Sequence, residues 1–343
     1  MSLTSASHSS SINIPLSVLD LAPIVEGSDP QETFKKSMEL AQQVDRLNYH
    51  RYWLAEHHSM PGIASAATSV LIGYIAGGTK RIRVGSGGVM LPNHAPLVIA
   101  EQFGTLESLY PGRIDLGLGR APGSDQQTAR ALRRDLSMTG EEFPQQLAEL
   151  RSYFAPYDPS APKRVRAVPG EGLNIPIWLL GSSGFSAQLA GQLGLPFAFA
   201  SHFSPENTVP ALDLYRRSFQ PSEVLQEPYA LVCVNIVAAD SDEEAEYLAT
   251  SGKQMILDMI RGKTPGKMKP PVNNMDDLWS DYERMIVERQ SSTAITGSQE
   301  TVKAKLQSFI EKTAANEVMV TCQVYDQQAR LRSYELIAEL MAR

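Results

Sequence analysis

The sequence predicts a single-domain, closed (β/α)₈ barrel, and three observations support this prediction. The chain has 343 residues, which suits such a barrel and is enough to bury a large core. Short apolar runs alternate with helical patterns eight times, as βα units do. Seven of the eight runs are apolar almost throughout, which is typical of parallel strands buried on both faces. Eight such units favour a closed barrel over an open doubly wound sheet.

The apolar runs place the strands, and the patterns between them place the helices. Strands are expected over residues 16–20, 52–55, 82–86, 114–118, 177–181, 197–200, 232–238 and 317–321. Helices are expected over residues 30–47, 64–77, 96–109, 125–135, 143–154, 184–193, 205–217, 241–260, 299–312 and 327–342.

Three segments fall outside this repeat. The serine-rich residues 1–13 are expected to form a disordered tail, so that the barrel covers residues 14–343. Residues 155–176 and 261–292 are expected as insertions after the fourth and seventh strands. Because long loops in compact domains are often lids, the region of about 252–292 is expected to cover the active site.

Composition narrows the classes of function. The net charge is −7 and no basic stripe is present, so nucleic acid is not an expected partner. Cys233 and Cys322 lie inside apolar runs and are expected to be buried thiols, not a disulfide framework. The first residues lack the features of a signal peptide, and no apolar run reaches the roughly 18 residues of a membrane helix. A cytoplasmic location without membrane contact is expected.

Four polar or glycine-rich segments follow predicted strands, namely EHH (56–58), GSGGVMLPN (85–93), GRAPGSD (119–125) and GSSGFS (181–186). Because the active site of a (β/α)₈ barrel lies at the carboxyl ends of its strands, these segments are expected to meet on one face.

The segment GSSGFSAQLA (181–190) marks a strand end, two serines and a helix start. Free backbone N–H groups at a helix start, together with hydroxyl groups, can hold a phosphate, and simple helix capping by serine is the alternative. The segment is not a nucleophile elbow, because that motif requires glycine where Phe185 stands.

The segment GLGRAPG (117–123) is not a dinucleotide-binding fingerprint, because its spacing is one residue too long and it follows the fourth strand. Arg120 comes directly after that strand, where its guanidinium could bind a phosphate or carboxylate in a bidentate manner. A structural salt bridge is the alternative for Arg120. Glycines at the end of the third strand, Gly87 and Gly88, indicate either a close approach of a ligand to the backbone or a turn.

His57 and His58 are adjacent, so a strand end directs them to opposite sides and disfavours a shared metal ion. The motif HExxH is also absent, and no metal site is expected. One histidine facing the pocket would suit general acid–base chemistry, because its pKa lies near neutral pH. A structural role is the alternative.

Three longer runs together resemble one protein family over nearly the whole chain. They are YWLAEHH (52–58), GSGGVMLPNHAPLVIAEQFGTLESLYPGRIDLGLGR (85–120) and PIWLLGSSGFSAQLAGQLGLPFAFA (176–200). The family is that of the bacterial luciferase-like flavin monooxygenases, and the resemblance is to its non-light-emitting members. Gly119 replaces a cysteine that the luciferases carry, and residues 252–292 show no clear similarity, so light emission and a long-chain aldehyde substrate are not expected.

The resemblance implies specific roles. The cofactor would be reduced FMN, Gly87 and Gly88 would form a non-prolyl cis peptide beside the flavin ring, and His57 would be the catalytic histidine. The flavin phosphate would be held by Arg120, Gly181, Ser182 and Ser183. His58 and Glu101 match positions at a subunit interface, which implies a homodimer or a higher homo-oligomer.

The function implied is a monooxygenase that oxidises a small organic substrate with O₂ and with reduced FMN from a separate reductase. One alternative is a hydride-transfer enzyme that uses the deazaflavin F420. Others are a flavin-binding protein without turnover and a barrel that binds another phosphate ligand. The substrate is not specified by the sequence.

Overall fold

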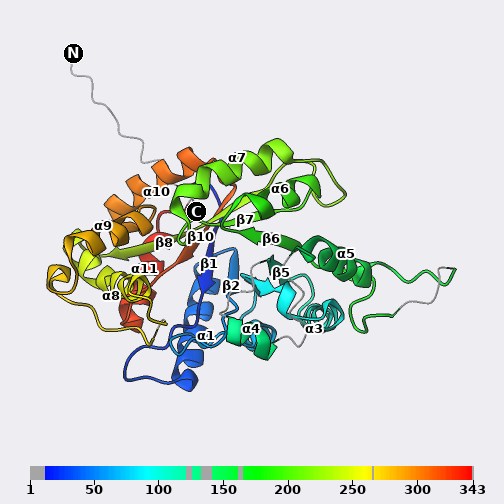
Figure 1. Cartoon of the computed structure of the whole chain (residues 1–343), viewed down its shortest axis with the longest axis horizontal. Helices are drawn as coiled ribbons and strands as arrows, with labels where there is room; N and C mark the ends of the chain where they lie inside the picture. Colours follow the sequence, from blue (N-terminus) through cyan, green and yellow to red (C-terminus); the bar gives the residue numbers. More distant parts are fainter. Residues whose placement is uncertain (1–11, 121–125, 133–140, 161–164, 265, 342–343) are drawn as a thin grey trace, which may run out of the picture.

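Eight parallel strands close into a barrel in the computed structural model of the chain, and helices surround it (Figure 1). The structure describes residues 12–120, 126–132, 141–160, 165–264 and 266–341. The barrel strands are β1 (Leu16–Asp20), β2 (Arg51–Leu54), β3 (Arg83–Ser86), β5 (Ile114–Gly119), β6 (Ile177–Gly181), β7 (Phe197–Ala200), β8 (Ala230–Ala239) and β10 (Glu317–Thr321). Strand β10 pairs in parallel with both β1 and β8, which closes the sheet. The predicted fold and its eight strands are confirmed.

The helices follow the strands in the predicted alternation. They are α1 (Pro30–Arg46), α2 (Thr68–Gly78), α3 (Pro96–Leu109), α4 (Gln126–Leu132), α5 (Phe143–Phe154), α6 (Gly184–Gln192), α7 (Thr208–Ser218), α8 (Asp242–Ile260), α9 (Asp281–Gln290), α10 (Gln299–Thr313) and α11 (Gln327–Ala338). Side chains of Asp29, Ser241 and Asp326 accept hydrogen bonds from first-turn N–H groups and so fix where α1, α8 and α11 begin. Helix α2 begins at Thr68, later than the predicted start at residue 64.

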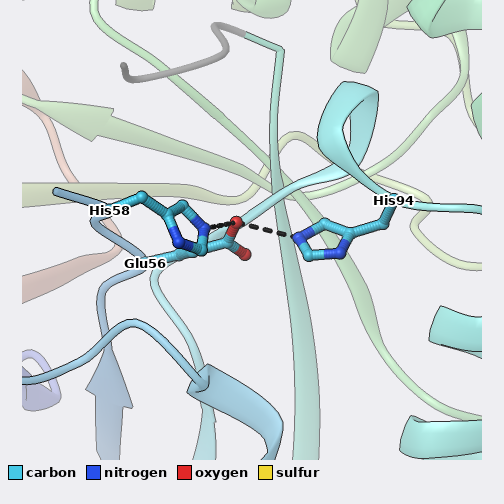
Figure 2. Close-up of side chains that lie close together, drawn as sticks. All are labelled: Glu56, His58 and His94. Carbon is cyan, nitrogen blue, oxygen red and sulfur yellow. Dashed lines mark hydrogen bonds and ion pairs between the residues drawn. The ribbon is translucent and has the colours of Figure 1, made fainter. Parts of the chain in front are cut away.

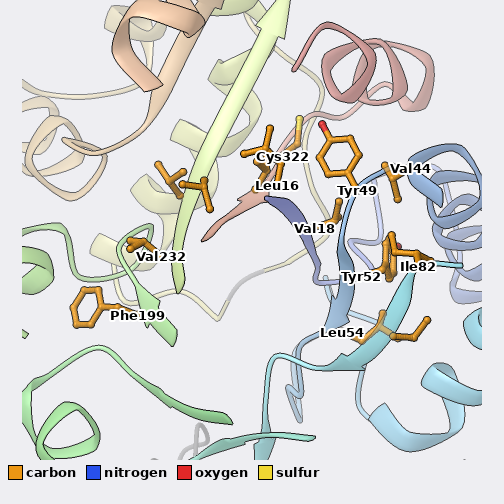
Figure 3. Close-up of a cluster of buried hydrophobic side chains, with 14 of the residues drawn as sticks. Leu16, Val18, Val44, Tyr49, Tyr52, Leu54, Ile82, Phe199, Val232 and Cys322 are labelled. Carbon is orange, nitrogen blue, oxygen red and sulfur yellow. The ribbon is translucent and has the colours of Figure 1, made fainter. Parts of the chain in front are cut away.

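Each strand packs on two faces. Outward-facing side chains such as Leu16 and Val18 of β1 and Leu54 of β2 belong to the large core between the barrel and its helices (Figure 3). Inward-facing side chains such as Leu19 and Trp53 belong to a separate cluster inside the barrel. This alternation follows from the two-residue period of a strand and explains why the runs are apolar throughout.

An ionic layer fills the barrel where the strands begin. The carboxylate of Asp115 accepts hydrogen bonds from Arg51 Nη1 (2.6 Å) and Arg83 Nη2 (2.6 Å). Arg51 Nε also donates to Glu317 (3.0 Å), and both carboxylates are fully buried. Charged side chains therefore fill the barrel at this end, and the segments that follow the strands lie at the other end.

Two short strands lie outside the predicted set. Strand β4 (Val89–Met90) pairs with the end of β5, and β9 (Ile295–Ser298) pairs with the last four residues of β8. The β9 sequence, ITGS, has no continuous apolar run, so hydrophobic patterning does not reveal it.

The two insertions reach opposite ends of the barrel. Residues 155–176 connect the end of α5 to the start of β6, so they lie on the side where strands begin, and residues 161–164 are outside the described part. The second insertion carries α9, and its Met268 exchanges backbone hydrogen bonds with Ile24 and Glu26, which follow β1 (both 2.8 Å). This segment therefore crosses the end where the strands finish.

Several smaller expectations have clear outcomes. Ile12, assigned to the tail, is 3% exposed and its N–H donates to the Leu340 carbonyl, whereas residues 1–11 lie outside the described part. Cys233 and Cys322 are buried free thiols, as predicted. Among the described residues, no helix combines the length and apolar character needed to cross a membrane.

Candidate active site at the carboxyl ends of the strands

The structure brings the predicted site residues to one end of the barrel. His57 follows β2, Gly87 and Gly88 lie between β3 and β4, and Arg120 follows β5. The segment 181–183 runs from the last residue of β6 to the start of α6. These segments follow neighbouring strands in the order β2–β3–β5–β6, so they form one continuous rim.

The peptide bond between Gly87 and Gly88 is cis, as the family resemblance implied. A Cβ atom on Gly87 would lie 2.7 Å from Leu19 Cδ1, and one on Gly88 would lie 2.8 Å from the Gly117 carbonyl oxygen. The contact at Gly88 is with backbone and leaves no room for a side chain, whereas the contact at Gly87 is with the end of a leucine side chain, which could shift. Packing within the chain therefore accounts for glycine at position 88, whether or not a flavin ring lies against it.

Arg120 reaches the start of α6. Its guanidinium lies 4.3 Å from the centre of the Phe185 ring, in the first turn of that helix, which is a cation–π contact. None of the described carboxylates forms an ion pair with Arg120, although residues 121–125, directly after it, lie outside the described part. The contact places a positive charge beside the segment 181–183.

The start of α6 has free hydrogen-bond donors. Ser183 occupies the N-cap position, but its side chain does not accept the capping hydrogen bond. The first N–H groups of a helix have no partner within the helix and carry partial positive charge. Helix capping by serine, the alternative for this motif, does not explain Ser183. No hydrogen bond to another described residue occupies the hydroxyl groups of Ser182 and Ser183, which could therefore bind an anion beside Arg120.

His57 is partly shielded from solvent, and one of its ring nitrogens has no hydrogen-bond partner among the described residues. Within the described residues, nothing accepts from or donates to its buried Nδ1 atom. Burial lowers the pKa of His57 below the ordinary value of 6.5, and the nearby Glu56 carboxylate offsets this only in part. The imidazole is therefore neutral at pH 7, and its free nitrogen can take part in hydrogen bonding or proton transfer.

Glu56 is the centre of a hydrogen-bonded cluster with His58 and His94 (Figure 2). Its Oε1 atom accepts from Nε2 of both histidines at 2.8 Å, and its Oε2 atom accepts from the Met90 N–H at 3.2 Å. The Glu56 side chain is 2% exposed. These contacts join the segment after β2 to the segment after β4, directly beside the cis peptide.

The directions of the adjacent histidines agree with the expected geometry. Glu56 and His58, two residues apart, share the cluster, whereas His57 does not. His94 completes the cluster from a different segment, and its position in LPNHAP, just past the third barrel strand, is the signal that could have identified it.

The cluster has the donor types of a metal site, namely two imidazoles and a carboxylate. Its three ligand atoms also lie within 4.8 Å of one another. The hydrogen bonds already account for both carboxylate oxygens of Glu56. The prediction that the chain has no resident metal remains untested for this cluster.

Replacing Glu56 with glutamine should lower the free energy of unfolding by about 1–3 kcal/mol at pH 7. One of the N–H groups that now donate to the carboxylate would then face the NH₂ group of glutamine, which cannot accept a hydrogen bond. Burial raises the pKa of Glu56, but the hydrogen bonds from His94, His58 and Met90 outweigh it and the pKa falls below the ordinary 4.5. The stabilisation is therefore present above pH 4.5 and is lost as the pH falls further.

Urea denaturation from pH 7 to pH 3 tests this expectation. The difference in free energy of unfolding between wild type and Glu56→Gln should become smaller as the pH falls. The control Glu223→Gln, at an exposed position, should have the free energy of unfolding of wild type throughout. A difference that stays constant over this range would contradict the assignment.

Two further polar side chains at this end were not predicted. His202 follows β7, Asn235 lies on β8, and the His202 Nδ1 and Asn235 Oδ1 atoms are both buried without a partner among the described residues. The placement of His202 just past a barrel strand is a signal in the sequence, whereas Asn235 lies in the middle of β8 and has no such signal.

The expected interface residues lie close to this end. Glu101 lies on α3 and is half-buried, and His58 is half-buried through its bond to Glu56. A single chain does not test whether they meet across a dimer.

Comparisons with known proteins agree with this geometry. Residues 14–317 match the family model described as luciferase-like monooxygenase. An uncharacterised protein of Bacillus subtilis, YvbT, is 62% identical, with 95% of this chain and 96% of that protein aligned. A luciferase-like monooxygenase of Escherichia coli is 57% identical, with 95% of this chain and 97% of that protein aligned.

Solved structures resemble the whole barrel. Apo-MsnO8 superimposes with a TM-score of 0.84 at 35% identity and covers 96% of this chain and 98% of its own. The oxygenating constituent of 3,6-diketocamphane monooxygenase from Pseudomonas putida, solved with FMN, shares the fold at a TM-score of 0.69 and 18% identity, covering 96% of this chain and 97% of its own. The family model and the two relatives extend over nearly all of the sequence, and the chain belongs to the luciferase-like monooxygenase family.

Proposed function

We propose that the protein is a flavin-dependent monooxygenase that uses reduced FMN and O₂ to oxidise a small organic substrate. The observation that carries the proposal is the convergence of an anion-binding corner and an unpartnered neutral imidazole on one rim of the barrel. Arg120 and the start of α6 form the corner, and His57 provides the imidazole. Family membership supports monooxygenation as the reaction class. The two features on the rim support this end of the barrel as the place of the reaction.

The corner suits the phosphate of FMN. The Arg120 guanidinium is held over Phe185, beside the segment that carries Ser182 and Ser183. Arginine offers paired N–H donors, and the uncapped helix start adds backbone N–H donors and a favourable dipole. Gly181 has no room for a side chain, because a Cβ atom would lie 2.9 Å from Ser186 Cβ. Its backbone can thus pass close to the bound group.

His57 would hold or move a proton. Because burial keeps the ring neutral at pH 7, its free Nδ1 atom can accept a proton or, in the other tautomer, donate a hydrogen bond. A reduced flavin, when bound, supplies the electrons that monooxygenation needs. The FMN complex of the P. putida enzyme supports FMN as the cofactor, with the deazaflavin F420 as the alternative to be tested.

The second insertion would restrict access of water. Gly266 lies so close to Gly62, which follows β2, that a Cβ atom on Gly62 would be 1.9 Å from the Gly266 carbonyl oxygen. Met268 pairs with the segment after β1. The insertion thus spans two strand ends, which is the position of a lid that protects reactive species from solvent.

Oxygen uptake with chemically reduced FMN tests the proposal, and His57→Ala is expected to lower substrate-dependent turnover by about 10²- to 10⁴-fold. Because the pKa of His57 is lowered from 6.5, the neutral ring persists below that pH, and the acidic limb of the rate profile should lie below pH 6.5. The substrate assay uses a panel of small organic compounds with product detection.

The control for this assay is His50→Ala, a histidine before β2 on the opposite end of the barrel. Tight FMN binding without product from any compound would support a carrier without turnover. Anaerobic reduction of a substrate with reduced F420, and none with FMN and O₂, would support hydride transfer instead.

We also propose a homodimer formed through α2 and α3, served by a separate flavin reductase. Exposed apolar side chains gather on these helices, with Val70 69%, Tyr74 45% and Val98 43% exposed. Helix α2 is also rich in small residues, which allow a second helix to pack closely against it.

The double variant Val70→Asp, Tyr74→Asp should shift the protein from dimer to monomer in sedimentation velocity, because two charges would be buried without partners. Tyr282→Asp on α9, where the side chain is 68% exposed, is the matched control and should remain dimeric. A monomeric wild type would refute the interface.

A further inference from the structure

Two buried polar atoms near the ends of the β7 and β8 pairings have no hydrogen-bond partner among the described residues. The His202 N–H donates to the Cys233 carbonyl at 3.1 Å, which ties the residue after β7 to β8, two positions before Asn235. Both His202 Nδ1 and Asn235 Oδ1 are buried and have no partner in the described part of the chain. Buried polar atoms usually have partners, and these two exceptions lie on paired strands at the end of the barrel that carries the other candidate-site residues, where a ligand could supply the missing hydrogen bonds.

Apolar side chains lie deeper in the barrel, below these two atoms. Cys233 and Met319 point into the barrel as members of the inner cluster, together with Ala198 and Leu180. Strand periodicity then places Asn235, two residues beyond Cys233, on the same inner face. The neutral Thr321 of β10 is the register partner of Asn235, and the groups that shift the pKa of His202 include no carboxylate, lysine or arginine of the described residues.

His202 itself is uncharged at neutral pH. Burial lowers its pKa to about 4, and the nearby His57 adds to this effect, while the Cys233 carbonyl opposes it. The ends of β7 and β8 therefore offer a neutral ring nitrogen and an amide oxygen, without a charged side chain of the described residues acting on His202. Such a setting penalises a charged ligand group, which would lose its hydration without an opposite charge.

We propose that His202 and Asn235 form a substrate subsite that binds an uncharged group able both to donate and to accept a hydrogen bond, such as a hydroxyl or a primary amide. The group would donate to Asn235 Oδ1 and bond to His202 Nδ1, whose tautomer sets the direction of the second bond. This inference deepens the proposed function, because it assigns a substrate class to the same barrel mouth.

Two probes of equal chain length test the subsite. Hexanamide carries the neutral donor–acceptor group and hexanoate carries a charge, and binding of each to the FMN-loaded protein is followed by ligand-observed NMR at millimolar concentration. Wild type is expected to prefer hexanamide at least tenfold. His202→Leu and Asn235→Leu should each weaken hexanamide binding about tenfold and leave FMN affinity unchanged.

The matched control is Asn207→Leu, an exposed asparagine before α7, which should bind hexanamide like wild type. Stability provides a readout without a ligand. Because Asn235→Leu replaces an unpartnered buried amide by an isosteric apolar group, the midpoint of thermal unfolding should stay the same or rise. A structural role for Asn235 would instead lower the midpoint.

Hexanamide binding by Asn235→Leu within twofold of wild type, no preference in wild type, or a lower midpoint in Asn235→Leu would each overturn the subsite. Failure of the proposed function is distinguishable, because it would appear as absent FMN binding or absent oxygen uptake while the preference for hexanamide, measured on the protein without FMN, persists.

Discussion

Replacing Arg120 with alanine is expected to weaken FMN binding by about 10- to 100-fold. Hydrogen bonds to charged groups contribute roughly 1.5–3 kcal/mol, and each 1.4 kcal/mol corresponds to a tenfold change in Kd. The Arg120 side chain is positioned by its contact with Phe185, so a bound phosphate would meet a guanidinium that is already ordered. Fluorescence titration of FMN gives Kd directly.

The chain offers a matched control for this variant. Arg166 also lies over an aromatic ring, that of Tyr157 at 4.2 Å, but it belongs to the insertion between α5 and β6, at the other end of the barrel. Arg166→Ala removes the same kind of side chain and contact and should leave the Kd for FMN unchanged.

Riboflavin, which lacks the phosphate, separates the contribution of Arg120 further. It should bind wild type and Arg120→Ala with similar affinity, since the phosphate is the group that Arg120 is proposed to bind. Equal FMN affinity in wild type and Arg120→Ala would exclude the phosphate assignment. The start of α6 would then be the remaining candidate for that role.

The barrel could be predicted because its strands are buried on both sides. Leu16 and Val18 face helices while Leu19 faces the interior, so each strand must be apolar at nearly every position, and this leaves a strong signal in the sequence. Strand β9 pairs with a single neighbour, β8. Its sequence needs no continuous apolar run, and it was missed.

The site was predictable only where one segment carries the whole chemical feature. Arg120, the serines before α6 and the glycine pair stand directly after strands, and the resemblance gave them roles. Glu56 could not be assigned, because one of its partners, His94, lies 38 residues away. Tertiary structure decides such contacts, and local sequence patterns carry no information on them.

His202 and Asn235 also could not be assigned from local sequence patterns. An unpartnered buried atom is defined by what surrounds it in three dimensions, and no spacing of residues in the chain encodes it. The rule that barrel chemistry lies at strand ends points to His202, which follows β7, but not to Asn235 inside β8. It does not separate a ligand-binding histidine from a structural one.

Replacing Asp115 with asparagine is expected to lower the free energy of unfolding by about 3–5 kcal/mol, because removing one partner from a buried ion pair leaves uncompensated charge. Asp115 accepts hydrogen bonds from Arg51, Arg83 and Trp53, and its side chain is fully buried. In the variant, Arg51 would keep its ion pair with Glu317, whereas Arg83 would lose the carboxylate with which it pairs. Urea denaturation at pH 7 measures the loss.

Asp240→Asn is the matched control, since Asp240 also pairs with an arginine, Arg332 at 3.0 Å, but its side chain is 68% exposed. Exposed pairs contribute at most about 1 kcal/mol, so this variant should unfold close to wild type. A loss below 1 kcal/mol for Asp115→Asn would show that the ionic layer does not hold the barrel. Folded Asp115→Asn should still bind FMN like wild type, because the layer closes the end of the barrel where the strands begin, and the proposed site occupies the end where they finish.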